Sequence, residues 1–236
     1  MGLPKINDVP LYTAIVPSSG KQVNFRPFLV KEQKILLIAF ESQDEGQIIN
    51  AMINTINSCC EGIDASTLAK IDVDYLFAMI RAKSVGENVK LNSQCSKCQE
   101  QVTFEFNINE LKMPEMKHRS RVVDLSPEIK VKVRVPSYSD ILANRSYEEN
   151  ISTQETLSRL IISCIESVQT QEENIIMKDE TYEDKVNFIE FLTIDQFSKL
   201  GDFIGEIPTI SYDLEQTCEK CGSKEKRHVE GIDNFF

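Results

Sequence analysis

The sequence predicts an α+β protein in which helices pack on small antiparallel β-hairpins. Two observations indicate this class. Short segments with alternating apolar residues are followed by longer segments whose apolar residues recur at helical spacing, and two C-x-x-C pairs each lie between strand-like segments. The chain has 236 residues, 41% of them apolar and 27% charged. This composition is typical of a globular protein long enough to bury a hydrophobic core.

The first part of the chain predicts a hairpin, three helices and a second hairpin. Proline, serine and glycine separate the first two strands, and Ser66 is a suitable N-cap for the third helix, which we expect to end at Gly86. The predicted segments are strands at 11–16 and 21–28, helices at 31–42, 44–60 and 66–86, and strands at 88–93 and 101–108.

The second part predicts a similar order after a connector at 112–120. Ser137 or Ser139 can cap a short helix, and Ser152 or Thr153 can cap a longer one with an apolar face that runs to Val168. The polar and acidic stretch 169–183 is expected to be a loop. The remaining segments are strands at 121–125 and 129–135, helices at 185–192 and 193–205, and strands at 210–214 and around 228–229.

Four of the seven cysteines form the pairs Cys95/Cys98 and Cys218/Cys221. A C-x-x-C turn can aim two thiolates at one ion, so two such turns supply the four sulfurs of a closed tetrahedral Zn²⁺ site. The pairs lie about 120 residues apart, far beyond the roughly 15–20 of an ordinary zinc ribbon. We predict one structural zinc ion in a zinc-ribbon-like unit that ties the middle of the chain to its C-terminus.

Two alternatives to the shared zinc site remain open. Each cysteine pair can complete a separate site with another chain, or the thiols are simply free. The remaining cysteines, Cys59, Cys60 and Cys164, lie within apolar helical patterns and are expected to be packing residues. No secretory signal or long apolar run is visible, so we expect a protein that is not secreted and does not enter a membrane. In a reducing cytoplasm, paired cysteines indicate metal binding rather than disulfides.

The order of elements is similar in an N-terminal half, 1–111, and a C-terminal half, 112–236. Aligning Cys95 with Cys218 also places Ile71 on Ile194 and Leu91 on Leu214. An internal duplication and a coincidence of common elements both account for this. We expect the two halves to form one compact unit joined by the shared metal site.

The charge and the motifs exclude several classes of function. The net charge of −11 argues against binding to a phosphate backbone, which requires clustered Lys and Arg. There is no Walker loop, G-x-G-x-x-G or H-E-x-x-H motif, and no group of residues spaced for acid–base catalysis. We therefore expect neither an enzyme nor a small-molecule substrate. Two alternative functions remain. One is a zinc-ribbon adaptor in transcription or nucleic-acid handling, and the other is an enzyme whose site is assembled from residues distant in sequence.

Several segments together resemble a known family. They are Asn24 to Glu32, the pair Cys95/Cys98, Leu192 to Pro208, Cys218 to Gly222, and the C-terminal run Glu230 to Phe236. The sequence is similar in these segments to the baseplate hub and hub-assembly proteins of T-even-type contractile-tailed bacteriophages. The resemblance covers nearly the whole chain.

The resemblance implies a non-enzymatic role in assembling the central baseplate hub, as a chaperone or a minor hub component. It implies other hub or tail proteins as partners, and a location in the virion tail baseplate or the host cytoplasm. The chain ends in two aromatic residues, Phe235 and Phe236. Exposed aromatics at a free end predict either packing on the zinc hairpin or contact with a partner protein.

Overall fold

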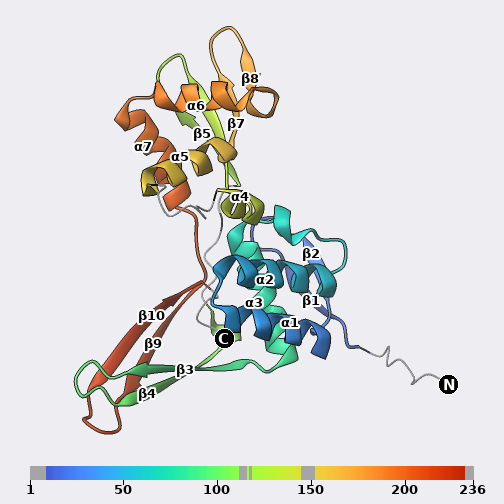
Figure 1. Cartoon of the computed structure of the whole chain (residues 1–236), viewed down its shortest axis with the longest axis vertical. Helices are drawn as coiled ribbons and strands as arrows, with labels where there is room; N and C mark the ends of the chain where they lie inside the picture. The colour runs from blue at the N-terminus through green and yellow to red at the C-terminus, as the bar shows by residue number, and fades with distance from the viewer. Residues whose placement is uncertain (1–8, 112–115, 117–118, 145–151, 232–236) are drawn as a thin grey trace, which may run out of the picture. The chain divides into compact units, whose positions relative to one another are not determined.

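The computed structural model describes residues 9–111, 116, 119–144 and 152–231. The chain divides into two compact units (Figure 1). Unit 1 comprises Met1–Ala65, Ile71–Glu115 and Thr209–Phe236, and unit 2 comprises Ser66–Lys70 and Met116–Pro208. The C-terminal hairpin thus belongs to unit 1. The boundaries of the two units differ from those of the predicted halves, 1–111 and 112–236, which stay a prediction.

Unit 1 contains a hairpin and helices followed by two longer hairpins. The first hairpin pairs its strands antiparallel, with Tyr12 opposite Phe25. Asp44 is suited to capping and accepts a hydrogen bond from the N–H of Gln47 at the start of α2. The elements are β1 (Tyr12–Ile15), β2 (Gln22–Phe25), α1 (Val30–Ser42), α2 (Glu45–Cys59), the 3₁₀ turn η1 (Ala65–Thr67) and α3 (Lys70–Ser84).

Helix α3 lies at the centre of the helical part of unit 1. Six of its apolar side chains are completely enclosed: Ile71, Val73, Leu76, Phe77, Ala78 and Ile80. The Asp72 carboxylate is enclosed too, and it accepts hydrogen bonds from the N–H (2.8 Å) and the hydroxyl (2.5 Å) of Ser18. Because a buried charge without donors is costly, these bonds fix the β1–β2 turn against α3.

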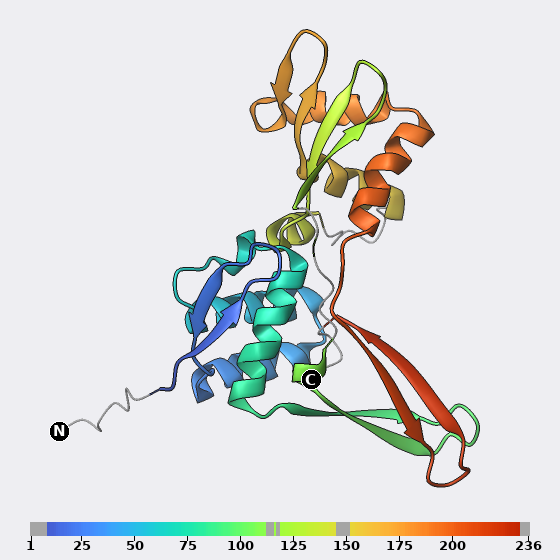
Figure 2. The same cartoon turned by 180° about the vertical axis from the view of Figure 1, so that it is seen from behind.

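The two longer hairpins of unit 1 carry the C-x-x-C pairs at their turns. Strands β3 (Asn88–Gln94) and β4 (Gln101–Asn107) form one hairpin, and β9 (Ser211–Thr217) and β10 (Lys224–Glu230) form the other. The 3₁₀ turn η2 (Ile108–Glu110) follows β4. Figures 1 and 2 show the hairpins side by side, with β4 packed on β9. The predicted cysteine hairpins are confirmed, and the strands of the second are longer than the sequence pattern indicated.

Unit 2 is a four-stranded antiparallel sheet with helices packed on it, in the strand order β5-β6-β7-β8. Its elements are β5 (Ser120–Asp124), β6 (Lys130–Arg134), α4 (Tyr138–Ala143), α5 (Thr153–Cys164), β7 (Ile165–Gln169), β8 (Asn174–Ile176), the 3₁₀ turn η3 (Met177–Asp179), α6 (Tyr182–Glu190) and α7 (Ile194–Gly205). The core joins the sheet to three of these helices, through residues that include Val131, Val133, Ile161, Val168, Ile189, Leu200 and Phe203.

Two predictions for unit 2 are wrong. The helix expected to run to Val168 ends at Cys164, because Ile165–Gln169 pairs with β6 as strand β7. β-branched residues there suit a strand, and pairing within the sheet outweighs the helical spacing of the apolar residues. The stretch 169–183 is not a plain loop, since it holds β8, η3 and the first turn of α6. Mixed helices and small antiparallel sheets are nevertheless the observed class.

Corresponding elements recur along the chain at fixed spacing. Four pairs of elements begin 108 residues apart: β1 and β5 at 12 and 120, β2 and β6 at 22 and 130, α1 and α4 at 30 and 138, and α2 and α5 at 45 and 153. The cysteine hairpins begin and end 123 residues apart, with β3 and β9 at 88–94 and 211–217, and β4 and β10 at 101–107 and 224–230. The chain therefore contains two series of elements with the same order.

A local ion pair also occurs once in each series. Arg26, directly after β2, donates to Glu32 at 3.0 Å, and Arg134, the last residue of β6, donates to Asp140 at 2.6 and 3.0 Å. Each carboxylate also accepts the backbone N–H of the residue that caps its helix, at 2.8 and 2.7 Å. The residue before each arginine pairs with the residue that follows the second helix after it: Phe25 with Cys60 after α2, and Val133 with Ile165 after α5. The two series thus share contacts as well as order.

The buried carboxylate on α3 gives a first prediction. Replacing Asp72 by Ala leaves the donors of Ser18 without their partner, so the free energy of unfolding should fall by about 1–3 kcal/mol. Ser18→Ala removes only the hydroxyl donor and should cost about 1 kcal/mol or less. Urea denaturation measures both. Equal stability of Asp72→Ala and the unchanged protein would contradict the role given to this contact.

Candidate metal centre

The two C-x-x-C turns have the same backbone geometry. In the first, the N–H of Gln99 donates to the carbonyl of Cys95 at 2.9 Å, and in the second the N–H of Gly222 donates to the carbonyl of Cys218 at 2.9 Å. Gln99 and Gly222 have positive φ angles of 59° and 71°. Glycine adopts this conformation readily and glutamine does not, so the first turn holds its geometry against a local preference.

The turns bring the four predicted cysteines together. All four Sγ atoms lie within 4.8 Å of one another. The closest distances join the two hairpins, 3.7 Å between Cys95 and Cys221 and 3.6 Å between Cys98 and Cys218. These distances exceed an S–S bond of about 2.05 Å. A tetrahedral ion with Zn–S bonds of about 2.3 Å would place its sulfurs about 3.8 Å apart, so the four thiols fit a closed metal site.

The surroundings of the sulfurs are not symmetric. The N–H of Cys221 acts most strongly on Cys218 and lowers the pKa of that thiol to about 7. The N–H of Cys98 acts on Cys95 in the same sense, but burial and the Glu225 carboxylate outweigh it and raise the pKa of Cys95 to about 12. Glu225 accepts a hydrogen bond from the Cys95 thiol at 3.3 Å. A metal-bound thiolate could not donate this bond.

Glu225 also holds the first turn through its neighbour. Its carboxylate accepts the N–H of Ser96 at 3.2 Å and the hydroxyl of Ser96 at 3.1 Å. The sequence pattern does not indicate this residue, because Glu225 stands between two cations, Lys224 and Lys226. The only signal was an acidic residue at the fourth position after Cys221.

The cations near the turns are engaged with other partners. Lys220 pairs with Glu100 at 2.5 Å, Lys226 pairs with Glu215, and Arg227 donates to Ser93. The basic cluster at 224–227 is therefore partly neutralised within the hairpins. A nucleic-acid adaptor needs a free basic surface, and two of the three cations of this cluster, Lys226 and Arg227, are engaged within the hairpins.

The other predicted residues have different outcomes. Cys59, Cys60 and Cys164 are buried, as expected of packing residues, and burial raises the pKa of these thiols to about 11, 12 and 12. Phe235 and Phe236 lie outside the described residues, so their role stays a prediction.

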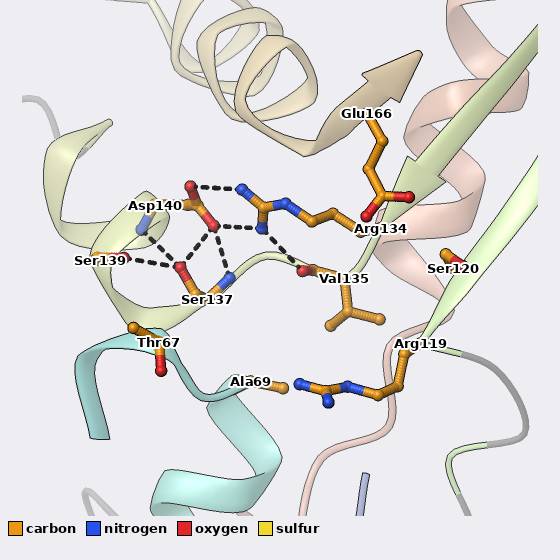
Figure 3. Close-up of a pocket in the computed structure, with 10 residues that line it drawn as sticks. All are labelled: Thr67, Ala69, Arg119, Ser120, Arg134, Val135, Ser137, Ser139, Asp140 and Glu166. Atoms are coloured by element: carbon orange, nitrogen blue, oxygen red, sulfur yellow. Dashed lines mark hydrogen bonds and ion pairs between the residues drawn. The ribbon is translucent and has the colours of Figure 1, made fainter. Parts of the chain in front are cut away.

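A cavity of about 510 Å³ in unit 2 tests the idea of an enzyme site assembled from distant residues (Figure 3). Its polar lining includes Arg119, Arg134, Ser137, Asp140 and Glu166. Burial alone would raise the pKa of Asp140, but hydrogen bonds from Arg134 and Ser137 outweigh it and lower the pKa. The Asp140 carboxylate is held by these partners as the cap of α4, which is a structural task.

The chain is similar to known proteins over nearly its whole length. Residues 9–236 match the family described as T4 bacteriophage base plate protein. The chain is 24% identical over 230 residues to the baseplate hub assembly protein gp26 of Enterobacteria phage T4, covering 95% of this chain and 97% of that protein. No solved structure matches the chain. No described helix is long and apolar enough to cross a lipid bilayer.

The Arg134–Asp140 pair gives a second prediction. The side chains are 33% and 15% exposed, so Asp140→Asn should lower the free energy of unfolding by about 1–2 kcal/mol at neutral pH, less than for a fully buried pair. Because folding lowers the pKa of Asp140, this contribution is complete above the unfolded pKa of about 3.9 and is lost as the pH falls through the folded value.

Denaturation of both proteins between pH 3 and pH 7 measures the effect, and the two stabilities should converge in acid. Glu155→Gln, which removes the exposed partner of Arg159, is the matched control and should change stability little. A difference that persists unchanged in acid would contradict the assignment to Asp140.

Proposed function

Because this chain belongs to the T4 bacteriophage base plate protein family, we propose that it acts in assembly of the central baseplate hub through protein–protein contacts. Its role would be that of a chaperone or of a minor hub component, in the virion tail baseplate or in the host cytoplasm during assembly. The observation that carries the proposal is similarity across nearly the whole of both chains to a protein named for hub assembly.

The proposed role is structural and not enzymatic. The relative is named for assembly, and the cavity carboxylate Asp140 has a lowered pKa where an acid–base catalyst would need one nearer neutrality. The proposed partners are other baseplate hub or tail proteins. With a net charge of −11, the chain is suited to approach basic surfaces on such partners.

The proposed cofactor is a single structural Zn²⁺ ion held by Cys95, Cys98, Cys218 and Cys221. The donor set supports it, since four thiolates at tetrahedral spacing suit zinc and leave no open position for substrate. Zinc bound there would supply no reaction chemistry. Its binding free energy would instead fasten the β9–β10 hairpin to the β3–β4 hairpin, in a zinc-ribbon-like unit.

The proposed origin of this unit is an internal duplication of halves 1–111 and 112–236. Support comes from the fixed spacing of element starts, from the repeated Arg–carboxylate pair, and from the matching C-x-x-C turns. The sulfur contacts have the same relation: exchanging each cysteine for its counterpart turns the Cys95–Cys221 contact into the Cys218–Cys98 contact. Each half would then contribute two ligands to one site on a pseudo-twofold axis.

Metal analysis of the purified, reduced protein tests the zinc proposal. We expect one zinc per chain, lost in Cys95→Ser and equally in Cys218→Ser, with a lower melting temperature in both. Cys164→Ser, at a buried cysteine outside the cluster, should keep its zinc and is the matched control. Retention of half the metal in either cluster variant would indicate separate sites, and a metal-free native protein would overturn the proposal.

Assembly in the infected cell tests the functional proposal. A phage carrying a stop codon in this gene should fail to complete its baseplate hub, and supplying the protein in trans should restore complete tails. Mass spectrometry of purified virions then separates the two roles: a retained hub component is present at a fixed ratio to other hub proteins, and a chaperone is absent. Normal tails without the protein would refute the proposal.

A further inference from the structure

We propose that the outer face of helix α1 docks an apolar surface of another baseplate protein that carries a carboxylate opposite Lys34. This inference rests on the proposed function and names the surface that would carry it. The α1 outer face is defined here as Val30, Lys34, Ile35, Leu37 and Ile38. None of these residues takes part in the cysteine cluster.

The exposure of this face is the first observation. Helix α1 packs mainly on α2 and buries Glu32, Leu36 and Ala39 (Figure 1). Four other aliphatic side chains of the helix are 54–67% exposed: Val30, Ile35, Leu37 and Ile38. Single exposed aliphatic residues are common, but a contiguous group on one helix marks an interaction surface.

The helical spacing places a cation within this apolar group. Val30, Leu37 and Ile38 stand four residues before, three after and four after Lys34, so all three neighbour it on the helix surface. Among the described residues Lys34 has no ion-pair partner, whereas the next lysine, Lys31, lies 3.3 Å from Glu32. A partner that covers the face would have to satisfy this ammonium group.

The second series of elements differs in sequence at the apolar positions of α1. Because α1 and α4 begin 108 residues apart, Ile35, Leu37 and Ile38 correspond in sequence to Ala143, Arg145 and Ser146. The buried capping carboxylate is kept in both series, as Glu32 and Asp140. The capping carboxylate therefore recurs in both series, whereas the large aliphatic residues at 35, 37 and 38 occur only in the first.

Charge decides between the candidate occupants. A second copy of the chain, docked through a twofold axis at this face, would bring Lys34 against its own copy and would join two chains of net charge −11. A different protein can present a carboxylate within an apolar surface and satisfy both requirements. The protein that docks here is thus different from this chain. Under the proposed function, it is another protein of the baseplate.

Pairwise binding tests the proposal. The tagged, metal-replete chain is measured against each other baseplate protein of the same phage. The test variant is Leu37→Arg/Ile38→Ser, which introduces the residues of the second series and leaves the buried side of α1 intact. We expect at least about tenfold weaker binding to the hub partner, and about tenfold corresponds to 1.4 kcal/mol. Val122→Arg, at a 51% exposed aliphatic residue of β5, is the matched control and should bind normally.

A charge variant isolates the lysine. Lys34→Glu should weaken the same complex, and Lys34→Gln should reduce its salt dependence, because the proposed contact pairs opposite charges. Circular dichroism melting and zinc content must equal those of the unchanged protein. If the double variant misfolds, Ile38→Ser alone provides the same comparison.

The outcomes separate this inference from the proposed function. If the unchanged chain binds a hub protein and the α1 variants bind equally well, the docking face is wrong and the assembly role stands. If the unchanged chain binds no baseplate protein, the proposed function fails. If sedimentation shows a self-associated dimer that the double variant dissolves, the occupant is a second copy and the proposal of a hetero-partner is overturned.

Discussion

Four sulfur atoms from opposite ends of a long stretch of chain meet in unit 1, and the placement of residues 209–231 depends on that meeting. Other contacts also join the two hairpins, which bury apolar side chains such as Phe104 and Leu214 and share the Glu225–Ser96 and Arg227–Ser93 hydrogen bonds. Phe106 and Tyr212 stack with their rings 5.1 Å apart, and Lys220 pairs with Glu100 on the surface. A two-stranded hairpin is marginal by itself, and exposed ion pairs add little. With the proposed ion bound, the sulfur cluster would add a directional constraint on the register of one hairpin against the other.

The helical part of unit 1 and the sheet of unit 2 each contain a second interaction, between an arginine and a carboxylate. In each, an arginine at the end of a strand holds the carboxylate that caps the next helix. The same arginine also donates to a carbonyl at the end of a later helix, at Ser58 or Ser163. One guanidinium thus joins three segments through its fixed fork of donors, which lysine could not do. The arrangement turns the chain from strand to helix at the same point in both series.

The sequence predicted the elements whose pattern has a single interpretation. The cysteine hairpins were found because strand-like segments flank an unmistakable turn, and α1 and α2 because their apolar residues recur at helical spacing. The prediction failed at 165–183, where Ile165 and Val168 suit a helix face and a strand equally well. There the partner strand β6 decides, and local pattern contains no information about it. Glu225 was missed for a related reason, since its role depends on Ser96, which is 129 residues away.

Comparison of the two series separates what folding requires from what it permits. Their common features are interior: capping carboxylates, buried strand residues such as Val23 and Val131, and one cysteine pair each. Their differences lie on the surface of α1 and in the added segment from β7 to α6. A shared four-sulfur centre constrains both series at once, because neither can lose its pair without losing the site. Under the proposed duplication, the surface residues of the two series were free to diverge, whereas the four cysteines were not. Specific recognition of other proteins would then arise at those surface residues.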